Sequence, residues 1–181
     1  MPHTPTDVIA FWREAGPARW FARDAQFDAC CTDFLATHHA AARGAHDEWA
    51  ATPDGALALL LVLDQIPRNV FRDSAHAFAT DGLARRHAQA AIEAGHDRAV
   101  DAALRVFFYL PYEHSEALAD QDHAVALIEA LEGDQAATFI DYAHRHRDVI
   151  RRFGRFPHRN RALGRTNTAD EQAWLDAGGG F

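Results

Sequence analysis

Three segments of the 181-residue sequence gather arginine, histidine, carboxylate and amide side chains around a proline. They are residues 64–72 (DQIPRNVFR), 110–116 (LPYEHSE) and 153–160 (FGRFPHRN). The planar guanidinium group of arginine can bind a carboxylate or phosphate through two parallel hydrogen bonds, and a histidine beside a carboxylate can transfer a proton near neutral pH. These residue types together predict a pocket for a small anion. They leave open whether the protein is also an enzyme that converts the anion by acid–base catalysis.

Each segment contributes candidate residues to this predicted pocket. Those expected to bind the anion are Arg68, Asn69, Arg72, Arg155, Arg159 and Asn160. Those expected to take part in catalysis are His114 and His158, which would move protons, and Glu116 and Asp64, either of which would orient a histidine. His146 is a further histidine that could carry a proton. A structural interpretation stays open, because arginine and histidine near the C-terminal end of a helix also bind its free carbonyl groups.

Metal and nucleotide chemistry have weaker support in the sequence. Two predicted helix faces carry possible metal ligands, one with Glu116, Asp120 and His123 and the other with Asp141 and His144. The chain lacks the full Glu-x-x-His pattern of di-iron helix bundles, so no metal and no other cofactor is predicted. It also lacks a glycine-rich phosphate loop and has no lysine at all, which argues against a nucleoside triphosphatase.

The charge of the chain is unevenly distributed. The net charge is −8, yet residues 145–165 hold eight arginines and a single acid, Asp148. A basic segment of this kind can bind nucleic acid, but no nucleic-acid-binding motif is present and the chain as a whole is acidic, so nucleic acid is a disfavoured partner. The longest apolar run, residues 56–63, is too short to span a membrane. We therefore expect a cytoplasmic protein that does not associate with a membrane.

Composition and helix signals predict an all-α fold. Alanine accounts for 38 residues, and no hairpin sequence such as Asn-Gly is present. Start and stop signals divide the chain into about nine helices in antiparallel hairpins, expected at residues 5–14, 24–42, 45–51, 54–65, 81–95, 97–110, 116–132, 134–153 and 168–177. Residues 1–181 are expected to form a single helical domain, with residues 177–181 as a frayed tail.

The predicted helices determine where the three polar segments would lie. The fourth, sixth and eighth helices each end near a proline, at Pro67, Pro111 and Pro157. In a strictly up-and-down array the C-termini of these three helices point the same way. The three segments would then meet at one end of the domain and line a common pocket.

Seven runs of residues carry a resemblance to a known family. They are WF at 20–21, DQIPRNVFR at 64–72, AFATD at 77–81, FFYLPYEHSE at 107–116, DQ at 120–121, RFGRFPHRN at 152–160 and LGR at 163–165. Together they resemble the bacterial family catalogued as domain of unknown function 924, over nearly the whole chain. The sequence departs from the family pattern at Tyr112, where an aliphatic residue is expected, and at His123, where another polar residue is expected.

The resemblance implies a fold but not a function. It implies an all-helical fold similar to that of tetratricopeptide-repeat proteins, with superhelical packing, whereas the biochemical function of the family is unassigned. Folds of this type bind partners on concave surfaces. A protein-interaction module that binds a peptide or protein, with structural proline segments, is therefore the alternative to the anion-binding pocket. The oligomeric state is not determined by the sequence.

Overall fold

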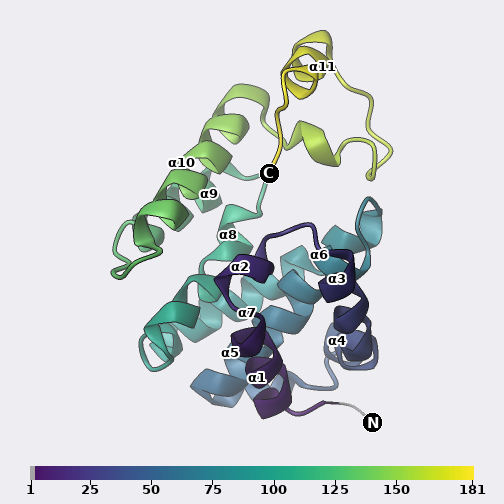
Figure 1. Ribbon diagram of the computed structural model, residues 1–181. Coiled ribbons are helices and arrows are strands. Elements are labelled where there is room, and N and C mark those ends of the chain that lie inside the picture. Colours follow the sequence, from purple (N-terminus) through teal and green to yellow (C-terminus); the bar gives the residue numbers. More distant parts are fainter. Residues whose placement is uncertain (1–2) are drawn as a thin grey trace. The chain divides into compact units, whose positions relative to one another are not determined.

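The computed structural model describes residues 3–181, and within that range every regular element is a helix (Figure 1). The predicted all-α fold is confirmed. The described chain forms two compact units. Unit 1 comprises the described residues up to Arg72 together with His76–Pro111, and unit 2 comprises Asp73–Ala75 and Tyr112–Phe181. The expected single domain and its tetratricopeptide-like packing both stay predictions.

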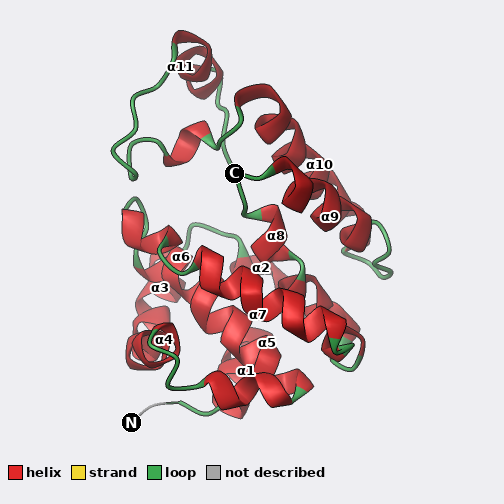
Figure 2. Cartoon of the chain, turned by 180° about the vertical axis from the view of Figure 1, so that it is seen from behind, coloured by secondary structure: helices red, strands yellow, loops and turns green. Residues whose placement is uncertain are grey.

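Unit 1 is organised around one central helix. Its α-helices are α1 (Pro5–Ala15), α2 (Pro17–Trp20), α3 (Ala25–Cys31), α4 (Leu35–Ala42), α5 (Pro53–Leu60), α6 (Ile66–Val70) and α7 (Asp81–Glu93). Helices α1 and α7 both pack on α5 (Figure 2). Residues 56–63, the apolar run of the sequence, are at most 1% exposed. A helix that is apolar on all sides is stable only inside a core, so this run lies where its composition predicts.

Capping residues fix several helix starts in the predicted places. Thr4 and Asp7 form a capping box at α1, and the Thr52 side chain accepts a hydrogen bond from the Gly55 N–H at the start of α5. Thr168 and Glu171 form a second capping box at α11 (Ala169–Asp176). The sequence is sufficient to predict these three helix starts because a capping hydrogen bond is local and joins residues three positions apart.

Two predicted helix stops are wrong. The helix expected to end before Pro67 instead continues through a π-helical turn, Leu61–Gln65, into α6 and ends at Val70. The helix expected over residues 97–110 is replaced by two 3₁₀ segments, His96–Arg98 and Ala102–Phe108, followed by α8 (Leu110–Glu113), which contains Pro111. Both prolines lie in the first turn of a short helix, the position at which a helix tolerates proline best, although the helix that precedes Pro67 leaves one carbonyl, Leu63 O, opposite its missing N–H.

Unit 2 contains a helical hairpin and a short C-terminal helix. Helices α9 (Leu118–Ile128) and α10 (Ala136–Phe153) pack side by side, and a 3₁₀ segment, Pro157–Arg159, leads towards α11 (Figure 2). Buried residues Val149, Ile150 and Phe156 form a small core, against which Phe153 and Trp174 pack. Over residues 3–181, no helix is both long and apolar enough to cross a membrane.

The C-terminal arm, residues 177–181, contacts other residues of unit 2, and its expected fraying stays a prediction. The Gly179 N–H donates to Trp174 O at 2.9 Å, and Gly179 lies so close to the Trp174 ring that a side chain would not fit there. The Phe181 ring stacks on His146, with 3.6 Å between the ring centroids. Composition suggests fraying because glycine has the highest conformational entropy of any residue, whereas the aromatic contacts on either side oppose it.

Candidate functional site

The first polar segment, in unit 1, is closed by its own ion pairs. The Arg68 guanidinium donates two hydrogen bonds of 2.9 Å to the Asp81 carboxylate, and it lies 3.1 Å from the fully buried Asp64 carboxylate. The Arg72 guanidinium holds Asp28 in the same bidentate manner. An external anion would have to displace a bidentate carboxylate from either arginine.

Side chains of the same segment also donate hydrogen bonds to backbone carbonyls of the π turn. Because the Ile66 N–H donates to Leu61 O, five residues back, and Pro67 has no N–H, the carbonyls of Val62 and Leu63 lose their usual α-helical donors. Side chains replace those donors: His38 Nδ1 lies 2.8 Å from Val62 O, and the Thr80 hydroxyl donates to Leu63 O.

Two residues predicted to bind the anion, Arg68 and Asn69, instead donate hydrogen bonds to the next two backbone carbonyls. Arg68 Nη1 donates to Asp64 O at 2.6 Å, and Asn69 Nδ2 donates to Gln65 O at 3.1 Å. Buried carbonyl groups require such partners. The motif DQIPRN therefore builds and seals a helix irregularity, which is the structural interpretation that the sequence left open.

The second and third polar segments meet inside unit 2. The Phe156 N–H donates to Glu116 Oε1 at 2.8 Å, and Arg159 Nη1 donates to His114 O at 2.9 Å. Gln121 of α9, which is fully buried, donates to the carbonyls of Glu113 and Ser115 and so fixes the second segment. Because the first segment belongs to unit 1, a pocket common to all three segments stays a prediction.

Most of the charged candidates in these two segments are already paired. Glu116 receives two hydrogen bonds from Arg165, of 2.7 and 2.9 Å; although burial raises the pKa of Glu116, these bonds and the one from Phe156 hold it below its ordinary value. Arg155 holds Glu171 at 2.6 and 2.8 Å and thereby lowers the pKa of Glu171 to about 2. Glu116 therefore orients an arginine rather than a histidine.

The remaining candidates of the third segment also have local partners. Asn160 is fully buried; its Nδ2 donates to Asn167 Oδ1 at 2.8 Å and its Oδ1 accepts from Arg165 Nε at 2.8 Å. The Arg159 guanidinium lies over the Phe156 ring, 4.3 Å from its centroid. Both side chains therefore already have partners inside unit 2.

A buried histidine–carboxylate pair stands out among the titratable groups of unit 2. His146 Nδ1 lies 3.1 Å from Glu113 Oε1 and 2.8 Å from Tyr142 O, and both residues of the pair are buried. Burial holds the pKa of His146 well below its ordinary value. Two acceptors at Nδ1 fix the proton there, so Nε2, which has no hydrogen bond to any described residue, carries the lone pair of the neutral ring.

The two histidines nominated from the sequence surround this pair. The His114 ring lies 6.4 Å from that of His146, between centroids. Burial, and to a smaller extent Arg159, lowers the pKa of His158 to about 4, and its buried Nδ1 has no hydrogen-bond partner. His158 is therefore neutral at physiological pH and not a proton donor there.

The surface hollow of unit 2 lies along α10 and has a volume of about 410 Å³. It is lined by α10 residues Arg145, Asp148, Val149, Arg152 and Phe153, by Trp174 and by the arm residues 177–181. Arg145 makes a long, exposed ion pair of 3.8 Å with Asp141. Arg152 lies 4.6 Å from the centroid of the Phe153 ring and makes no ion pair or hydrogen bond within residues 3–181.

The sequence assignment of site residues missed Arg145 and Arg152, although a signal was present. Residues 145, 148, 149 and 152 have the i, i+3, i+4, i+7 spacing of one helix face. Glu113 is a further residue that the sequence does not single out, because its partner His146 is distant in the chain. Only the folded hairpin brings Glu113 to His146, which is 33 positions away in the chain.

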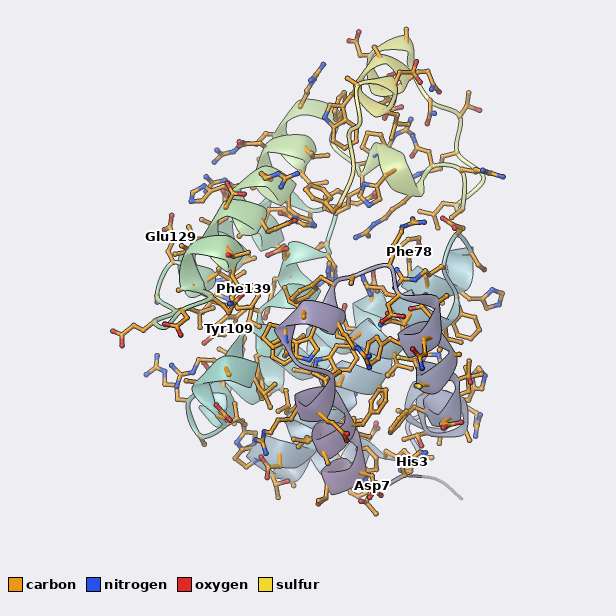
Figure 3. The ribbon with its side chains drawn as sticks, viewed as in Figure 1. His3, Asp7, Phe78, Tyr109, Glu129 and Phe139 are labelled. Atoms are coloured by element: carbon orange, nitrogen blue, oxygen red, sulfur yellow. The ribbon has the colours of Figure 1, made fainter. Side chains whose placement is uncertain are left out.

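The helix faces considered for a metal are occupied by other contacts. Glu129, labelled in Figure 3, lies 2.9 Å from His144 Nε2, and Asp120 accepts a hydrogen bond from the Ser115 hydroxyl at 2.6 Å. His123 packs edge-on against the Tyr112 ring. No group of three or more His, Cys, Asp or Glu side chains in the described chain could hold a metal ion.

Comparisons with known proteins give a fold and no chemistry. A family model described as a bacterial protein of unknown function, DUF924, matches residues 8–179. A solved structure titled as a protein of unknown function from Agrobacterium tumefaciens is 48% identical and has a TM-score of 0.90, with 96% of this chain and 97% of that chain covered. No curated protein matches the sequence.

Proposed function

The chain belongs to the DUF924 family of bacterial proteins, whose function is unknown, and from the geometry of unit 2 we propose that it binds a small anion in the hollow along α10, called the α10 hollow below. The observation that carries this proposal is Arg152, a guanidinium facing the hollow with no ion pair within residues 3–181. An arginine without a carboxylate partner can bind an external carboxylate or phosphate without breaking an existing pair.

Exposed arginines such as Arg43 and Arg161 also lack an ion pair within residues 3–181, but Arg152 lines a hollow, and four other arginines are already paired. Arg68, Arg72, Arg155 and Arg165 each hold a carboxylate through two hydrogen bonds. Arg145, which also lines the hollow, has only a half-exposed pair with Asp141, and exposed pairs of this kind contribute little. The aromatic side chains of Phe153, Trp174 and Phe181 line the hollow together with both arginines, and apolar surface of this kind strengthens the attraction of a cation for an anion.

Isothermal titration calorimetry with inorganic phosphate and with benzoate at low ionic strength tests the proposal. Both anions are expected to bind, with an affinity that falls as salt is added. Arg152→Ala should abolish binding, whereas the matched control Arg161→Ala should retain it, because Arg161 is an exposed arginine of unit 2 that does not line the hollow. Equal binding by both variants would contradict the site. Absence of anion binding to the wild type would favour the protein-interaction module instead.

The Glu113–His146 pair favours acid–base conversion of the bound anion as a second candidate function. A carboxylate that fixes the proton on Nδ1 leaves Nε2 as a general base, and the lowered pKa keeps the ring in its basic form at neutral pH. A panel of phosphate monoesters and carboxylate esters should contain a compound whose turnover is lost in His146→Asn and reduced in Glu113→Gln. Turnover that is equal in all three proteins would come from another group or from a contaminant.

A further inference from the structure

The Phe181 ring lies in a slot formed by four side chains of unit 2. His146 stacks on it with an interplanar angle of 12°, and the Arg145 guanidinium lies 5.6 Å from its centroid. Phe156 and His158 meet the ring nearly at right angles, at 90° and 83°. Stacked and edge-to-face contacts of this kind are selective for flat aromatic rings. The slot is therefore shaped for a ring, whichever molecule supplies it.

Phe181 is held in the slot mainly by the contacts of its ring. The last backbone hydrogen bond of the arm is the one from Gly179 N–H to Trp174 O, two residues before the ring. Gly178 and Gly180 have φ values of 85° and 145°, in the region that favours glycine, so the arm consists of residues with little resistance to rotation. Residue Phe181 as a whole is 43% exposed. A competing ring would therefore displace Phe181 without unfolding a helix or breaking an ion pair.

The slot and the α10 hollow share Phe181, which belongs to both. Phe181 lines the hollow and covers His146, and Arg145 contacts both the ring and the hollow. A ligand ring in place of Phe181 would leave its acidic group in the hollow, beside Arg145 and Arg152, and would lie against the imidazole of His146.

On this basis we infer that the ligand of the α10 hollow is an anion that carries a planar aromatic ring, and that Phe181 occupies the ring-binding slot in its absence. Only the binding of the acidic group rests on the proposed function, that is, on the anion site at Arg152. The slot itself depends on the contacts of Phe181, which are independent of Arg152.

Matched ligands and variants test the slot. Phenyl phosphate should bind more tightly than methyl phosphate, and benzoate more tightly than cyclohexanecarboxylate, which has the same charge but no flat ring. Phe181→Ala removes the competitor and should tighten the aromatic ligands by about two- to tenfold, the range of one aromatic pair, while inorganic phosphate changes less than twofold. The control Leu163→Ala removes another exposed apolar side chain of unit 2 and should change neither.

A neutral ring separates failure of the slot from failure of the anion site. Benzyl alcohol added to Phe181→Ala should shift the NMR signals of the His146 ring, whether or not Arg152 is present. If it does, and phosphate does not bind, the proposed anion site is wrong but the slot stands. If anions bind and Phe181→Ala changes no aromatic affinity, and benzyl alcohol leaves His146 unshifted, the inference is overturned. Circular dichroism melts of Phe181→Ala, expected to match the wild type, confirm that the variant is folded.

Discussion

Two arginine-rich regions of this protein use the same residue types for opposite purposes. Around the π turn of unit 1, Arg68 holds two carboxylates and a backbone carbonyl, and every group faces a fixed internal partner. Along α10 of unit 2, Arg152 faces a hollow and has only a ring beneath it. The difference shows that an arginine beside polar residues is not in itself a ligand site; what matters is whether the fold already supplies its anion.

The largest expected effect comes from removing the arginine of the closed region. Arg68→Ala removes the guanidinium that pairs with both Asp64 and Asp81, and breaking one side of a buried ion pair costs about 3–5 kcal/mol of unfolding free energy. Urea unfolding followed by circular dichroism measures the loss. Arg151→Ala, which removes an exposed pair, serves as the control and should cost less than about 1 kcal/mol. Similar losses in both variants would remove the distinction between the two regions.

Thr80→Val is expected to have the next largest effect. The valine keeps the volume of threonine but leaves Leu63 O, opposite the missing Pro67 N–H, without a donor, at a cost of about 1–3 kcal/mol. The same urea titration measures it. The matched control is Thr32→Val, since the Thr32 hydroxyl also donates to a carbonyl, that of Ala29, but at an exposed position where water can replace it. If Thr80→Val left the free energy of unfolding unchanged, the π turn would not need its side-chain donor.

His158 should be one of the buried histidines, together with His146, that make the stability of unit 2 depend on pH above pH 4. Burial lowers the folded pKa of His158 to about 4, below the ordinary value of 6.5, so the unfolded chain binds the proton more readily. This contribution to stability is complete above pH 6.5 and is lost as the pH falls towards 4. Thermal melts of the wild type and His158→Asn between pH 7 and 4 should therefore converge or cross as the pH falls, with the wild type losing more. Parallel curves would contradict the burial of a neutral ring.

Glu171 should add a second pH dependence at lower pH. The Arg155 hydrogen bonds lower its folded pKa to about 2, so the stability that it contributes is present above the ordinary carboxyl pKa of about 4.5 and is lost as the pH falls through 2. The difference in melting temperature between the wild type and Glu171→Gln should shrink over that range. A constant difference would indicate that the Arg155 pair does not depend on the charge of Glu171.

The smallest effect on stability is expected for the arginine on which the proposed function depends. Arg152→Ala removes an exposed cation with no ion pair, so the free energy of unfolding should change by less than about 0.5 kcal/mol. Anion binding should nevertheless be lost. A strongly destabilised Arg152→Ala would show that the residue is structural, like Arg68, and would remove the basis for the proposed site.

The sequence predicted the helical class, the caps at Thr4, Thr52 and Thr168, and the meeting of the second and third polar segments. It did not predict that Pro67 lies within a continued helix, because a proline at the start of one helix and a proline after the end of another look alike without the intervening hydrogen bonds. The pairing of Arg155 with Glu171 could not be foreseen either, since partners 16 residues apart are chosen by the path of the chain. The α10 face, by contrast, can be read from the spacing of residues 145, 148, 149 and 152.

The π turn at Leu61–Gln65 gives the central helix one residue more than an α-helical register would hold. Deleting one residue from this turn would turn the Ile66 N–H to Leu61 O bond into an ordinary α-helical bond, and the residues after the turn would keep their facing on the core. The same deletion inside the regular helix α7 would rotate the residues after it by about 100°. A single-residue deletion in the π turn should therefore be better tolerated than one in α7.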